Sequence, residues 1–79
     1  MKNYNFLGYS KNEKFCIKGI DVFKYNWIML GQAVVVIDPE TGQPRNFSAY
    51  KIKINENKEI LFVAGKPSSD NRWLFFDYI

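Results

Sequence analysis

Histidine is absent from the sequence, and cysteine occurs once, as Cys16. Histidine is the side chain that most often acts as a general base near neutral pH, so Ser-His-Asp and Cys-His catalysis are both excluded. A single thiol cannot close an intramolecular disulfide or, without histidine, complete a Cys/His zinc site. We therefore expect no metal site and no disulfide in this chain.

Features of other catalytic sites are missing as well. The five glycines stand apart from one another and form no glycine-rich phosphate loop. The carboxylates are scattered, and no close pair of them is flanked by apolar residues. We expect that the protein is not an enzyme and that it binds no cofactor.

Long apolar runs are also missing. No run approaches the roughly 20 residues that cross a bilayer as a helix, and residues 1–14 lack the apolar stretch of a secretory signal peptide. The single cysteine is compatible with a reducing compartment. The sequence thus predicts a soluble, cytoplasmic protein that does not enter a membrane.

The net charge of +3 is small and unevenly placed. Residues 1–14 hold three lysines against one glutamate, whereas the rest of the chain has eight basic and seven acidic side chains. A nearly neutral body gives little reason to expect a polyanion as the main partner.

Apolar residues, by contrast, are abundant at 47% of the chain, and aromatic residues reach 18%. Such a composition is incompatible with disorder, because each ring can bury about 150–250 Å². A chain of 79 residues has room for a single domain only. We expect one small β domain over residues 1–79, in which residues 1–13 form either a peripheral strand or a loosely ordered arm.

Short runs of β-branched and aromatic residues alternate with turn-forming residues, which predicts antiparallel strands. The longest run, Trp27–Asp38, is apolar at both parities, and Gly31 marks an expected bend within it. Pro39 and Gly42 predict the turn that follows. Residues Asn46–Ile54 then alternate as a half-exposed strand.

Further strands are expected at residues 4–9, 14–24, 59–65 and 73–79. A bulge at Lys18–Gly19 would direct the apolar side chains of the second of these strands to one core. A short helix within residues 21–30 is the alternative there, because several apolar residues lie near helical spacing. In the last strand one parity must be buried, and the sequence does not say which.

These strands predict an all-β fold, an antiparallel meander of five or six strands. Small chains of this kind avoid exposed edges by curling into a closed sheet. We therefore expect a SH3-like or OB-like barrel, with an open meander as the alternative.

The 14 aromatic residues exceed what a small core requires, and Trp and Tyr are common anchors of protein interfaces. We predict a binding module that acts through protein–protein contacts, including self-association through the C-terminal strand. The expected contact surface comprises Trp27, Phe47, Trp73 and Tyr78, with Lys51 and Lys53 at its rim.

Single-stranded nucleic acid is the alternative partner. Small β-barrels stack bases on exposed rings along a basic groove, and here Arg45, Phe47, Lys51 and Lys53 would supply ring and charge. Alternating lysines are also typical of any exposed strand, where they hinder aggregation. A protein partner or a homodimer therefore stays the first prediction.

Overall fold

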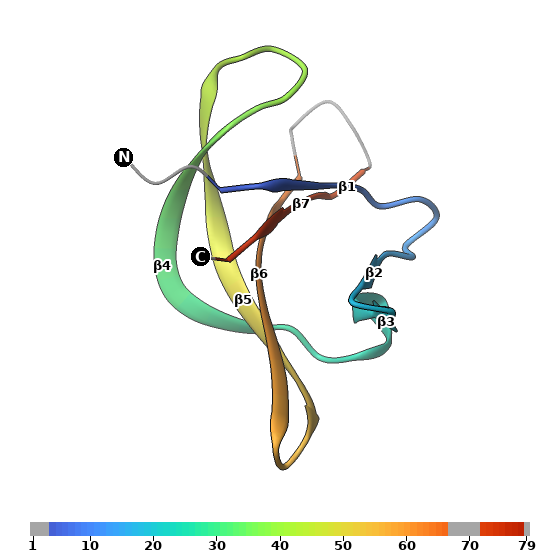
Figure 1. Cartoon of the computed structure of the whole chain (residues 1–79). Coiled ribbons are helices and arrows are strands. Elements are labelled where there is room, and N and C mark those ends of the chain that lie inside the picture. The colour runs from blue at the N-terminus through green and yellow to red at the C-terminus, as the bar shows by residue number, and fades with distance from the viewer. Residues whose placement is uncertain (1–3, 67–71, 79) are drawn as a thin grey trace.

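The computed structural model describes residues 4–66 and 72–78. Five antiparallel strands form one sheet in the order β1-β7-β6-β5-β4, and β2 and β3 form a separate hairpin (Figure 1). The elements are β1 (Phe6–Tyr9), β2 (Cys16–Ile17), β3 (Ile20–Asp21), the 3-10 helix η1 (Val22–Lys24), β4 (Ile28–Ile37), β5 (Pro44–Asn55), β6 (Lys58–Gly65) and β7 (Leu74–Asp77). The predicted all-β, antiparallel class is confirmed.

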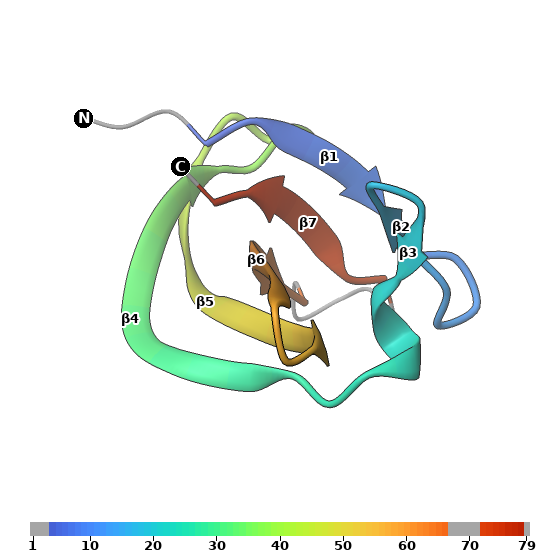
Figure 2. The same ribbon diagram turned by 60° about the horizontal axis from the view of Figure 1, so that its bottom comes forward.

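The strands β4 to β7 are neighbours in chain order, and β1 returns to pair with β7. The sheet is strongly curled, and β4 runs along the outside of the curl in Figure 2. Its two edge strands, β1 and β4, are not paired with each other in the described part of the chain. The expected closed barrel is therefore not found, and the sheet stays open.

Buried side chains form two clusters. The first, here the hairpin core, consists of Ile17, Val22, Ile52, Ile60, Phe62, Ala64 and Phe75. The second, here the sheet core, consists of Val34, Val36, Phe47, Ala49, Val63, Leu74 and Phe76. Successive residues of β6 and β7 alternate between the two cores, because neighbouring side chains of a strand point to opposite faces. The sheet is thus covered on both faces along β7 and the neighbouring half of β6.

The C-terminal strand β7 is buried on both faces. Leu74, Phe75 and Phe76 are 2%, 0% and 1% exposed. Side chains of both parities are therefore buried, and not those of one parity alone. Because β6 and β1 flank β7, neither of its edges is free. Self-association through this strand, as expected from the sequence, would require β1 to separate from β7.

The segment before β4 begins with a small hairpin. Lys18 (φ 52°) and Gly19 (φ 80°) adopt the left-handed conformation of a two-residue turn between β2 and β3. The bulge predicted at these residues is wrong, but its expected consequence is confirmed, because the apolar side chains all pack on the hairpin core. These side chains are Phe15, Ile17, Ile20 and Val22.

The helix considered for residues 21–30 is limited to the single turn η1. Its start is capped by Asp21, whose Oδ1 accepts a hydrogen bond from the Phe23 amide at 3.1 Å. The chain is extended again at Tyr25, before β4 begins. The strand prediction for this region therefore holds from Ile28 onward.

The predicted bend in β4 is confirmed. Gly31 has φ +76°, a value that other residues rarely adopt, and the register with β5 shifts between Met29 and Ala33. Trp27, just before β4, packs on the hairpin core, whereas Leu30, Val34 and Val36 of β4 pack on the sheet core. The change from one core to the other therefore precedes the bend.

Candidate functional site

Two of the predicted contact residues meet inside the hairpin core. Trp27 is half-buried, and its indole Nε1 donates a hydrogen bond to the Val22 carbonyl at 2.9 Å. Its ring centroid lies between 5.0 and 5.7 Å from those of Phe23, Tyr50, Phe62, Trp73 and Phe75. The half-buried Trp73 packs edge-on against it. Both indoles serve mainly to cover the core.

The other two predicted aromatic residues lie on the opposite side of the sheet. Phe47 is buried in the sheet core, 7% exposed, where its ring lies so close to Gly65 that any Cβ there would clash with it. Its prediction as a surface contact is therefore wrong. Tyr78 is half-buried against the same core. The four rings do not form one binding surface.

The two predicted rim lysines lie on β5, close to an acidic side chain. Lys51 Nζ is 3.4 Å from Glu59 Oε2, and Lys53 is the register partner of Glu59. The register partners of Lys51 are Ile28 and Leu61, so aliphatic rather than aromatic residues flank it. A row of rings and lysines for stacking bases is therefore not assembled here.

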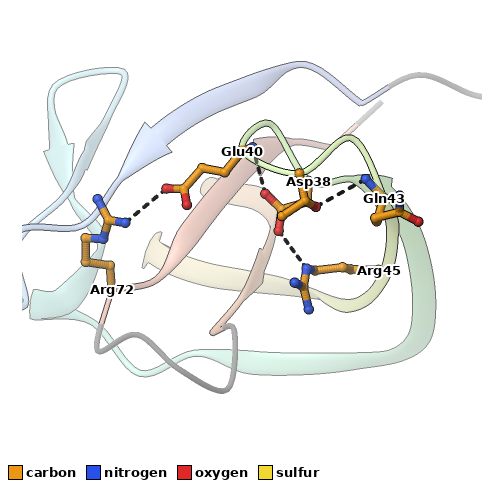
Figure 3. Close-up of polar contacts among 6 residues, drawn as sticks. Asp38, Glu40, Gln43, Arg45 and Arg72 are labelled. Carbon is orange, nitrogen blue, oxygen red and sulfur yellow. Dashed lines mark hydrogen bonds and ion pairs between the residues drawn. The ribbon is translucent and has the colours of Figure 1, made fainter.

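Arg45 belongs to a polar network in the turn between β4 and β5 (Figure 3). Its Nε donates to Oδ2 of the buried Asp38 at 2.6 Å, and the Glu40 amide donates to Oδ1 at 2.8 Å. The Glu40 amide, supported by the Arg45 guanidinium, lowers the pKa of Asp38, although burial of the carboxylate opposes this shift. This carboxylate holds the turn together.

A second ion pair ties this turn to β1 and to the start of β7. Arg72 Nη2 lies 3.0 Å from Glu40 Oε1, as Figure 3 shows, and the Arg72 guanidinium lies 4.4 Å from the ring centroid of Tyr9. Burial, and then the Glu40 carboxylate, raise the pKa of Tyr9. Because these charges are paired with one another, the network acts as a structural tie.

A shallow basic hollow lies beside this tie and was not anticipated from the sequence. It is lined by Ser10, Lys11, Asn12, Glu13, Lys66 and Arg72. Three basic side chains thus stand against one carboxylate. The cations of Lys66 and Arg72 lie over the rings of Trp73 and Tyr9, which leaves those ring faces covered rather than open to a base.

The most exposed apolar surface belongs to the edge strand β4. Ile28, Met29, Val35 and Ile37 are 45%, 61%, 48% and 49% exposed. This strand of 10 residues contains no charged side chain. Residues 27–38 are apolar at both parities in the sequence, a pattern typical of a strand covered on both faces, so no local signal identifies β4 as an edge.

The other edge strand, β1, is different. It has 4 residues, and its register with β7 shifts between Phe6 and Gly8. Short, irregular edges resist pairing with another chain. Among the described strands, β4 alone combines a free edge with a long uncharged stretch.

No family model, curated protein or solved structure matches the chain. No described helix has the length and apolar character needed to cross a membrane. Within residues 4–66 and 72–78, no group of three or more acidic or cysteine side chains is arranged to hold a metal ion.

Proposed function

We propose that this protein is a binding module that associates with another polypeptide along the free edge of β4. The observation that carries the proposal is an edge strand of 10 residues with no charge and four exposed large apolar side chains. Edge strands usually carry lysine, proline or bulges that discourage pairing. In β4 the only such device is the bend at Gly31.

Strand addition suits this geometry. Alternate residues of an edge strand direct their amide and carbonyl groups away from the sheet, where an added strand can pair with them. From Ala33 to Ile37 the register with β5 is regular, so this stretch offers an undistorted template. Burying the exposed half of Val35 or Ile37 would contribute about 1 kcal/mol each.

Single-stranded nucleic acid is the second candidate, and the basic hollow is the observation that favours it. Lys11, Lys66 and Arg72 would contact phosphate groups there. The covered rings of Tyr9 and Trp73 count against base stacking at this place. We rank this candidate below protein binding.

The proposal includes three predictions from the sequence. The absence of histidine and of paired carboxylates supports a role without catalysis. The single cysteine agrees with a cytoplasmic setting. Classification of the curled sheet as SH3-like or OB-like stays a prediction.

Selection from a displayed random-peptide library tests the binding edge. Peptides selected on the natural chain should lose binding to a Val35→Lys/Ile37→Lys double variant. They should keep binding to a Leu61→Lys control, because Leu61 is similarly exposed but lies on β6, an inner strand. If no peptide binds, or if binding survives the double variant, the proposal is wrong.

Titration of the isotope-labelled chain with short single-stranded RNA tests the second candidate. Amide shifts around Lys11, Lys66 and Arg72 that weaken as salt is added would favour nucleic acid, because phosphate contacts release counterions. Unchanged spectra at low salt would exclude it.

A further inference from the structure

We propose that the polypeptide bound by β4 is a second copy of this chain, paired antiparallel about a two-fold axis at Val35. The inference rests on the proposed function and names its partner. The two five-stranded sheets would join at their β4 edges into one continuous sheet.

The regular part of β4 is bounded symmetrically. Gly31, with φ +76°, bends the strand at one end, and Pro39, which has no amide N–H to donate, follows the strand at the other end. Val35 lies midway between them in the sequence. An antiparallel pair centred on Val35 is therefore the register that uses the whole stretch, with Gly31 opposite Pro39 of the second copy.

The side chains of this stretch complement themselves in that register. Ala33, the smallest, would face Ile37 of the second copy, the largest, and Val35 would face its own equivalent. These three residues form the exposed face of the strand. On the other face, Val34 would face Val36 of the second copy. Each cross-strand pair is apolar, and such pairs stabilise antiparallel sheets.

Charge does not oppose this contact locally. The first charged residue after the strand is Asp38, whose carboxylate is already bound by Arg45 and the Glu40 amide (Figure 3). It therefore faces into its own turn, and like charges do not meet at the axis.

The contact closes on itself rather than forming a filament. A filament would need β4 of one molecule to pair with β1 of the next. The edge β1 is short and its register is irregular at Phe6–Gly8, so it offers no matching template. A two-fold dimer is the assembly that this edge favours.

The dimer should be weak and should tighten with salt. Five paired residues per chain bury far less than the roughly 1,200 Å² of standard stable interfaces, so we expect a Kd on the order of 10⁻⁵ to 10⁻³ M. Each copy carries a net charge of +3, and salt screens the resulting repulsion. Nucleic-acid binding would respond to salt in the opposite direction.

Sedimentation velocity from about 10 µM to about 1 mM tests the inference. The natural chain and the Leu61→Lys control should dimerise equally. Val35→Lys and Val35→Glu should each weaken the dimer about tenfold or more, because like charges would face each other at the axis. Mixing these two variants should restore dimerisation, since residue 35 then meets its opposite charge.

A failure of that rescue would overturn the register, and a dimer indifferent to both charged variants would place the contact elsewhere on the molecule. A chain that stays monomeric at the highest concentration would overturn the inference. It would leave the proposed function standing if selected peptides still bind the β4 edge, so the two failures are distinguishable.

Discussion

The strands β4 and β7 have similar apolar sequences but occupy different environments in the structure. Both are apolar at both parities. In the structure, β7 is paired along both edges and buried on both faces, whereas β4 is paired along one edge and leaves Val35 and Ile37 about half exposed. Apolar character marks a strand that must be covered; the position of the strand in the sheet decides whether the chain itself covers it.

The largest loss of stability should come from replacing a buried phenylalanine of β7 by alanine. Phe75→Ala and Phe76→Ala each remove a fully buried ring, one from the hairpin core and one from the sheet core. We expect each to lower the free energy of unfolding by about 3–5 kcal/mol, measured by urea denaturation. If one of them costs less than about 1 kcal/mol, β7 is not buried on both faces and the contrast with β4 fails.

The same substitution at two adjacent residues of β4 should change the free energy of unfolding by very different amounts. Val34→Lys would bury a charge in the sheet core, where Val34 is 6% exposed, and we expect a loss of several kcal/mol. Val35→Lys directs the same side chain to solvent and should change stability by about 0.5 kcal/mol or less. Both are measured by thermal unfolding at protein concentrations below those proposed for dimerisation. Equal losses would show that the edge face of β4 is covered in the monomer.

Substitution of Asp38 in the turn after β4 should cause a pH-dependent loss of stability of intermediate size. Asp38→Asn removes charge-assisted hydrogen bonds to Arg45 and the Glu40 amide, at an expected cost of about 1–3 kcal/mol near neutral pH. Because the pKa of Asp38 is lowered by folding, its contribution is present above the unfolded pKa of about 4 and is lost as pH falls through the folded value.

The urea midpoint of the natural chain should therefore fall more steeply below about pH 4 than that of the Asp38→Asn variant. Glu40→Gln is the control, since its ion pair with Arg72 is exposed and contributes about 1 kcal/mol or less. Parallel pH profiles for the natural chain and Asp38→Asn would contradict this role.

A smaller loss of stability is expected from substitutions at the bend in β4. Gly31→Ala should cost about 1–2 kcal/mol, because a Cβ there meets no atom within 4 Å and the left-handed backbone is the sole penalty. Gly31→Asn should cost less, because asparagine tolerates this conformation. Chemical denaturation of the pair measures the difference. A larger loss for asparagine would mean that space, rather than backbone conformation, selects glycine.

The strands could be predicted from the sequence because their signals are local. Period-two alternation located β5, and the pair Pro39 and Gly42 located the turn before it. The bend at Gly31 was predicted from one residue. The sequence predicts a bulge at Lys18–Gly19 because the apolar residues before and after it differ in parity, and a two-residue hairpin turn brings the same residues to one core.

The candidate site could not be predicted in the same way. Phe47 is buried because it packs on Gly65, a residue brought close by the pairing of β5 with β6. Trp27 was expected at a surface, and it lies among five rings, four of which come from distant segments. Aromatic residues identify sites of contact, and they do not distinguish a core from an interface.

The order of residues by itself determined that the chain is an antiparallel β domain without histidine chemistry, because strand alternation, turn residues and side-chain inventory are properties of neighbouring or single residues. The tertiary structure decided which apolar strand is enclosed and which is an edge. That outcome depends on the pairing of β1 with β7, which joins the two ends of the chain, encloses β7 and leaves the far side of β4 unpaired.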